Sequence, residues 1–311
     1  MSSDDESTND DIITEEMLWE RIPQVQGAER AETFYELSAR IYARGQYDEA
    51  LALAETARDI YSELGAGAPL EGLAQAYSAI GYNLNQLHRI EEAANAMTKA
   101  VELLREHKSP MALELACTLG EWLYSSKEYR KAIECIEDCV QEHLVDGNDM
   151  GAANDFYLIG CARRDLGEHS EAISAFNEAR TIYKKLKEVI HVARCDQKIA
   201  YSLVALGDAE GAEIAAQRAL DVFQTANDHR RETFALFELG KARILSGNVD
   251  NGLATLRRVL RTIAESEDKD FEFILEVEEE IAKTLRASGD SVGASEIERR
   301  IETVREIIEE K

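Results

Sequence analysis

Apolar and small residues recur along the chain with a period of about 40 residues. A small residue closes a short apolar run at Ser38, Gly81, Gly120, Gly160, Ala200, Gly240 and Ala282, which we call the small positions. The steps between them lie between 39 and 43 residues. A repeat of this length is typical of stacked two-helix units, in which each unit contacts only its neighbours. The pattern therefore predicts about seven tandem units.

Each small position is followed by a turn and a second helical segment. Seven residues later the chain has Gly45, His88, Lys127, Gly167, Gly207, Gly247 and Gly289. Twelve residues later it has Ala50, Ala93, Ala132, Ala172, Ala212, Gly252 and Ala294. Glycine can adopt a positive φ and end the first helix, and residues without bulk let two helices cross closely. We therefore expect helix-turn-helix units, with turns of a different shape at His88 and Lys127.

Composition agrees with helix throughout and restricts the partners. Proline occurs only at Pro23, Pro69 and Pro110. The net charge is -26, from 61 acidic and 35 basic residues. Because nucleic acids and anionic membranes attract basic surfaces, we expect no nucleic acid and no membrane among the partners. The acidity is interpreted as a source of solubility, with attraction of a basic partner as the alternative.

Cysteine usage and hydropathy indicate the compartment. The chain has five cysteines, an odd number, and no apolar segment opens it. No apolar run approaches the roughly 20 residues of a membrane span. These features predict a soluble protein of a reducing compartment, which we take as the cytoplasm. Cys135 and Cys139 are interpreted as small buried side chains rather than metal ligands, because no further Cys or His follows at ligand spacing.

The order of apolar, small, turn and alanine positions resembles the tetratricopeptide repeat family. The resemblance is clearest at 77–81 and 156–160, and it covers roughly residues 31 to 310. The usual repeat has about 34 residues, so this one is similar to the longer variants of kinesin light chains, Leu-Gly-Asn proteins and bacterial Rap regulators. It implies an all-α, right-handed α-solenoid with repeats starting near 31, 74, 113, 153, 193, 233 and 275. The seventh repeat departs from the pattern, because Glu278 and Glu298 occupy positions that are usually apolar.

The ends are expected to differ from the repeats. Residues 1–11 are acidic and predict a disordered tail, 12–30 predict a capping helix and linker, and 31–311 form the solenoid. Met17, Leu18 and Trp19 are expected to pack on the first repeat; docking of this segment in the protein's own groove is the alternative. The last helix carries an apolar stripe at Ile297, Ile301, Val304 and Ile308. It predicts a cap, or alternatively the seam of a homodimer.

The resemblance implies that one face of each first helix lines a concave groove. On and beside this face we predict a peptide-binding or partner-binding site of Tyr35, Tyr42, Tyr82, Asn85, Tyr124, Tyr157, Arg164, Arg194, Tyr201, Phe237, Lys241 and Arg286. Tyrosine gives a large contact area and a hydroxyl at low entropic cost, and basic residues can hold acidic side chains or a C-terminal carboxylate. The alternative is that the tyrosines pack on neighbouring repeats and the charges are solvated. Arg163 and Arg243 stand at usually aromatic positions, with stem packing or an acidic partner as alternatives.

These observations predict a scaffold or adaptor that binds a peptide or helix of a partner protein. A peptide-responsive regulator resembling the Rap type and a structural homo-oligomer are the alternatives. The sequence has no P-loop, no Gly-x-Ser-x-Gly and no His-Glu-x-x-His. We therefore expect no enzymatic activity, no cofactor and no metal.

Overall fold

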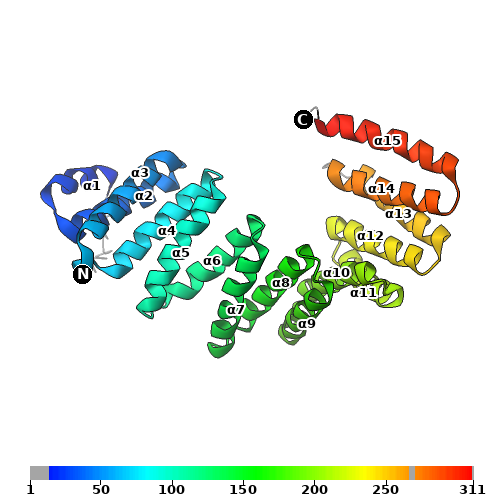
Figure 1. Ribbon diagram of the computed structural model, residues 1–311, viewed down its shortest axis with the longest axis horizontal. Coiled ribbons are helices and arrows are strands. Elements are labelled where there is room, and N and C mark those ends of the chain that lie inside the picture. The colour runs from blue at the N-terminus through cyan, green and yellow to red at the C-terminus, as the bar shows by residue number, and fades with distance from the viewer. Residues whose placement is uncertain (1–13, 266–269, 310–311) are drawn as a thin grey trace, which may run out of the picture. The chain divides into compact units, whose positions relative to one another are not determined.

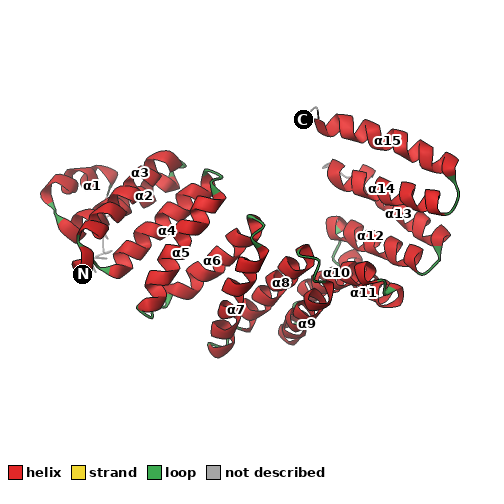
Figure 2. Cartoon of the chain, viewed as in Figure 1, coloured by secondary structure: helices red, strands yellow, loops and turns green. Residues whose placement is uncertain are grey.

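The computed structural model describes residues 14–265 and 270–309. Within these ranges every element is a helix, and short turns join them (Figures 1 and 2). The predicted tail at 1–11 lies outside the described residues. The chain divides into two compact units, Met1–Cys139 and Val140–Lys311, and each is described separately.

Unit 1 begins with a short helix and continues with helix pairs. Its elements are α1 (Glu15–Arg21), η1 (Ile22–Gln24), α2 (Gly27–Ala43), α3 (Tyr47–Glu63), η2 (Gly65–Gly67), α4 (Leu70–Gln86), α5 (Ile90–Glu106) and α6 (Met111–Ser125). The following helix, α7 (Tyr129–Val145), contains the boundary between the units. Contacts join α2 to α3, α3 to α4, α4 to α5 and α5 to α6, so each helix packs on the next.

Unit 2 continues the same arrangement. Its helices are α8 (Asp149–Asp165), α9 (His169–Leu186), α10 (Val189–Leu206), α11 (Ala209–Thr225), α12 (His229–Leu245), α13 (Val249–Glu265), α14 (Phe271–Ala287) and α15 (Ser291–Glu309). Successive helices again pack on one another. The predicted all-α solenoid of tandem helix pairs is therefore confirmed. None of the described helices combines the length and the apolar character needed to cross a membrane.

The small positions that are glycines receive bulky side chains from the second helix of the same pair. A Cβ atom built on Gly160 would lie 2.6 Å from Cε1 of Phe176 on α9. At Gly120 it would lie 2.5 Å from Cγ1 of Ile136. Because real Cβ atoms do not approach so closely, a methyl group here would displace the packed side chain.

The second-helix residue that packs on a glycine at a small position stands 16 positions after it. This residue is large where the small position is glycine, and it is smaller where the small position is Ala200. Gly81 faces Met97 and Gly240 faces Leu256 at this spacing. Where the small residue is Ala200, the residue 16 positions later is Ala216, and both are buried. The volume of the pair is thus partly conserved along the array, as dense packing requires.

The turns at His88 and Lys127 have the same conformation as the glycine turns, so the expected difference is wrong. His88 has φ 59° and Lys127 has φ 62°, against 79° at Gly167. The amide of Arg89 donates to the carbonyl of Leu84, as the corresponding amides donate after the glycines. This hydrogen-bond pattern ends a helix in a left-handed residue, which non-glycine residues adopt at a cost of about 1–2 kcal/mol.

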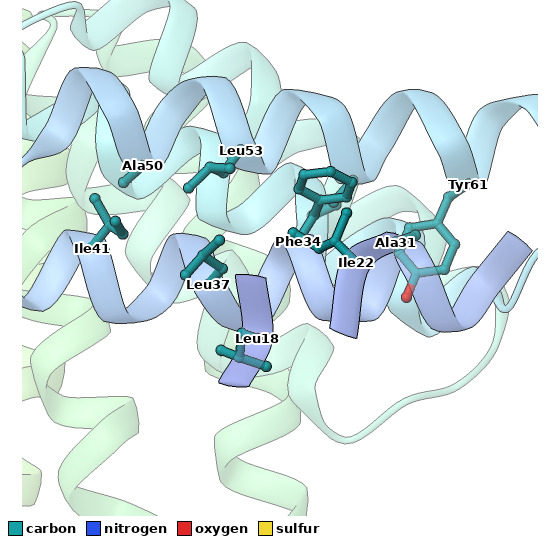
Figure 3. Packing of buried hydrophobic residues seen from close by; sticks show 11 residues of the cluster. Leu18, Ile22, Ala31, Phe34, Leu37, Ile41, Ala50, Leu53 and Tyr61 are labelled. Carbon is teal, nitrogen blue, oxygen red and sulfur yellow. The ribbon is translucent and has the colours of Figure 1, made fainter. Parts of the chain in front are cut away.

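The N-terminal helix α1 packs through one face only. Thr14 caps it, because its Oγ1 accepts a hydrogen bond from the amide of Met17 at 3.3 Å. Leu18 is fully buried and Ile22 follows it on the same face, with Leu37 and Phe34 of α2 in the same cluster (Figure 3). The expectation for Met17 and Trp19 is wrong: they are 49% and 46% exposed. A helix of seven residues can turn only one side to its neighbour.

The apolar stripe of α15 faces α14, on which this helix packs. Ile301 is buried, and Ile297, Val304 and Ile308 are half-buried. The two acidic residues that depart from the repeat pattern in the seventh repeat have cationic partners. Glu278 pairs with Arg300 and Glu298 with Arg286. Burial raises the pKa of Glu278, although Arg300 opposes the shift.

The contact at Gly160 yields a stability prediction. Gly160→Ala should lower the free energy of unfolding by about 1–3 kcal/mol, because the methyl group overpacks Phe176. Phe176→Leu in the same chain should recover part of the loss. Urea denaturation followed by circular dichroism measures both. Gly67→Ala is the control, since nothing lies within 4 Å of a Cβ there; equal midpoints for the Gly160 and Gly67 variants would contradict the packing account.

The left-handed turns yield a second prediction. His88→Gly and Lys127→Gly should each stabilise the chain by about 0.5–1 kcal/mol, because the relieved backbone strain exceeds the entropy that glycine adds to the unfolded chain. Thermal denaturation measures the gain. His107→Gly is a matched control at the end of α5, where φ is -94°. Stabilisation by the control as large as by His88→Gly would show that the left-handed backbone is not the cause.

Candidate functional site

Unit 2 brings half of the predicted binding residues into one row across α8, α10 and α12. The row consists of Tyr157, Arg164, Arg194, Tyr201, Phe237 and Lys241. The guanidinium of Arg194 on α10 lies 4.6 Å from the ring centre of Tyr157 on α8. The ammonium of Lys241 on α12 lies 5.0 Å from the ring of Tyr201 and 4.9 Å from that of Phe237. Arg164 of α8 lies 5.6 Å from the ring of Tyr201. Cations therefore stack on aromatic rings between adjacent first helices.

The aromatic residues of the row are unequally accessible. Tyr201 is 37% exposed, whereas Phe237 is 3% exposed. Tyr157 is half-buried, its ring lies 5.5 Å from that of Phe176, and burial raises the pKa of its hydroxyl. Tyr201 thus keeps part of its ring accessible, while Phe237 and much of Tyr157 support the packing of the repeats.

The protein's own carboxylates pair with most of the predicted basic residues. Arg164 pairs with Asp165 at 2.6 Å, and Lys241 with the buried Glu238 at 3.5 Å. Burial raises the pKa of Glu238, and Lys241 opposes this shift. Arg286, on α14, pairs with Glu298 of α15. The charge of these cations is therefore largely compensated within the protein.

Arg194 and Lys198 differ from these cations. Over the described residues, no carboxylate oxygen lies within 4.0 Å, the limit of an ion pair, of a side-chain nitrogen of Arg194 or Lys198. Burial lowers the pKa of Lys198, and the neighbouring Arg164 lowers it further. Both side chains line a pocket of about 390 Å³ between α8, α10 and α12.

Lys198 is a site residue that the sequence reasoning missed. It lies two positions before the small residue Ala200, at a position from which no residue was selected in the predicted site. Arg194, Lys198 and Tyr201 have the spacing i, i+4 and i+7, which is one face of a helix. Following that stripe from Arg194 would have found Lys198.

Unit 1 contains a second pocket, between α2 and α4. Its volume is about 320 Å³, and its lining is formed by Tyr35, Ser38, Ala39, Tyr42, Ser78, Ala79, Tyr82 and Asn83. Three predicted tyrosines therefore meet there, from two helices that contact each other (Figure 1). Gln86 donates a hydrogen bond to the hydroxyl of Tyr42 at 3.2 Å. Tyr82 packs its ring edge-on to Trp122 at 5.4 Å.

Asn83 is a polar residue of this pocket that the sequence reasoning did not select. Its side chain is 1% exposed, and Nδ2 donates to the carbonyl of Ala79 at 2.8 Å. Its Oδ1 is buried and has no hydrogen-bond partner among the described residues. A buried carbonyl oxygen without a donor is uncommon in folded proteins and calls for a physical explanation.

The remaining predicted residues lie apart from the two pockets. Asn85 is half-buried near the end of α4 and does not line the unit 1 pocket. Tyr124 is half-buried on α6, with its ring 5.6 Å from that of Tyr129.

Arg163 and Arg243 have acidic partners, which decides between the alternatives for these positions. Arg163 pairs with Glu168 at 3.4 Å. Arg243 pairs with Glu213 at 3.0 Å and also donates to the hydroxyl of Thr255.

Comparison with known proteins agrees with the repeat architecture. Residues 156–186, which cover the C-terminal part of α8 and all of α9, match the family model of a tetratricopeptide repeat. No curated protein matches the chain.

Solved structures share the fold at low sequence identity. One is a signal transduction ATPase with a tetratricopeptide repeat sensor from Pyrococcus horikoshii, with TM-score 0.66 and 15% identity over 93% of this chain. This chain spans 43% of that protein's length. The apo form of RapI has TM-score 0.59 and 15% identity, covering 90% of this chain and 99% of RapI. YrrB, described as a TPR protein with an unusual peptide-binding site, has TM-score 0.53 and 18% identity, covering 71% of this chain and 98% of YrrB.

The helix pairs, the small positions and these matches lead to one conclusion: the chain carries a tetratricopeptide repeat at residues 156–186 and has the fold of the tetratricopeptide repeat proteins.

Proposed function

We propose that this protein is an interaction scaffold that binds a peptide segment of a partner along the exposed faces of its first helices. The observation that carries the proposal is the unit 1 pocket, which three tyrosines line together with Asn83, whose buried Oδ1 has no hydrogen-bond donor among the described residues. Tyrosines supply contact area, and rotation of the Asn83 side chain would let its Oδ1 accept the missing hydrogen bond from a backbone amide of an extended peptide. The role is binding, without catalysis.

Several features support a peptide rather than a compact ligand. The pocket lies between two repeats, and the cation–aromatic row of unit 2 spans three first helices. Recognition surfaces spread over successive repeats suit an extended chain. The peptide-binding site named for YrrB belongs to a protein of the same fold, so it offers an analogy only.

The two alternatives are a peptide-responsive regulator, in which the ligand changes the conformation, and a homodimer, in which the last helix binds a second copy. A peptide-responsive regulator would bind the same segment and change conformation, which small-angle scattering with and without the peptide detects. A homodimer would use α15. The burial of Ile301 toward α14 supports a capping role for that helix instead, and a strict monomer in light scattering would remove the dimer.

The tyrosine pocket yields a binding prediction. A peptide selected by the full chain from a random 12-residue display library should bind Tyr42→Ala/Tyr82→Ala at least about tenfold more weakly, because central aromatic anchors dominate such interfaces. Fluorescence polarisation measures the affinity, and circular dichroism checks the helix content. Tyr77→Ala, on α4 but outside the pocket lining, should bind normally. Unchanged affinity in the double variant would refute the assignment.

Asn83 yields a prediction in which stability and binding change in opposite directions. Asn83→Leu should leave the denaturation midpoint unchanged or raise it, because a buried unpaired oxygen disappears. The same variant should bind the selected peptide about tenfold more weakly, because a backbone amide loses its acceptor. Loss of binding together with loss of stability would indicate misfolding, and retained affinity would show that Oδ1 does not contact the peptide.

A further inference from the structure

We propose that the pocket between α8, α10 and α12 binds an anionic group of the peptide ligand, a carboxylate or a phosphoryl group. This inference rests on the proposed peptide-binding function and specifies the chemistry that the second pocket recognises. The lining consists of Tyr157, Arg194, Gln197, Lys198, Asp228, Arg230, Arg231 and Phe234.

The charge balance of the pocket is the first argument. Four cationic side chains face it, and Asp228 is its single carboxylate. Arg231 pairs with Asp228, at the N-terminus of α12. No carboxylate within the described ranges lies at ion-pair distance from Arg194, Lys198 or Arg230. Arg194 and Lys198 are also half-buried, so solvent screens their charges less than those of exposed cations.

The second argument is the electrostatic cost that these cations carry. Lys198 is half-buried, and burial and then Arg164 are the main causes that lower its pKa. The groups that act on it are Arg164, Cys161 and Asp165 of α8 and Glu238 of α12. Asp165 already pairs with Arg164, and Glu238 with Lys241. A bound anion would relieve this unfavourable environment, so binding and protonation of Lys198 favour each other.

The third argument is that the pocket fits a charged group at the end of an aliphatic side chain. The ring of Tyr157 lies 4.6 Å from the guanidinium of Arg194, which restricts that side chain before a ligand arrives. Arginine presents paired donors that match carboxylate and phosphoryl oxygens, and the ammonium of Lys198 adds a point charge. Phe234 supplies an apolar wall for the stem of the ligand side chain. A volume of about 390 Å³ suits one such side chain.

The test compares four sets of random 12-residue peptides that differ only in a fixed central residue: Glu, phosphoserine, Gln or Lys. The full chain should retain the Glu set, the phosphoserine set or both at least about tenfold over the Gln and Lys sets. The two anionic sets show which group the pocket takes. Arg194→Gln/Lys198→Gln should lose the preference and keep its helix content.

Lys184→Gln/Arg257→Gln is the matched control. It removes two positive charges from unit 2 at exposed positions outside the pocket, and it should keep the preference of the wild type. Acetylation of single lysines, followed by mass spectrometry, gives a second measurement. A retained anionic peptide should slow the acetylation of Lys198 at least about threefold, because it raises the pKa of this amine and covers it, and should leave Lys184 unchanged.

The outcomes separate this inference from the function on which it rests. Peptides retained equally from all four sets, or an equal preference in the Arg194→Gln/Lys198→Gln variant, would overturn the anionic pocket and leave peptide binding intact. If the full chain retained no peptide from any set, the proposed function itself would fail, and the inference with it.

Discussion

Where the small position of a first helix is a glycine, a large side chain of the second helix, 16 positions later, packs against it. Phe176 on Gly160 and Leu256 on Gly240 are examples. At Ser38 the contact takes another form, because its hydroxyl donates to the carbonyl of Ala50 at 2.7 Å, twelve positions later. These contacts let the two helices of a pair approach closely, and they commit one face of each first helix to its partner.

Because that face is committed, the residues on the other faces of the first helices form the available surface. Tyr82 follows its small position by one residue, and Tyr157 precedes its own by three. Tyr82 lines the pocket between the neighbouring first helices α2 and α4, whereas the ring of Tyr157 lies in the core beside Phe176. Side chains at these positions therefore differ in accessibility: Tyr201 remains partly exposed, whereas Phe237 is enclosed.

The sequence predicted what depends on backbone spacing and missed what depends on side-chain neighbours. The small positions and turns follow a fixed period, so the helix pairs were predictable. The turns at His88 and Lys127 were misjudged because helix-terminal hydrogen bonds impose the left-handed conformation even without glycine. Trp19 was misjudged because only the docked helix defines its buried face. The pairing of Arg164 with Asp165 likewise depends on side-chain placement that periodicity does not encode.

Charge compensation decides which cations are available to a partner. Lys241 and Arg286 stand at the predicted positions, yet Glu238 and Glu298 pair with them. A ligand carboxylate would have to compete with these neighbours, and such exchange yields little net free energy. Arg194 and Lys198 have no carboxylate at ion-pair distance among the described residues. An anion there gains attraction without breaking a pair. In an acidic protein, recognition of an anion thus depends on half-buried cations that its own carboxylates leave unpaired, such as Arg194 and Lys198, rather than on the total number of basic residues.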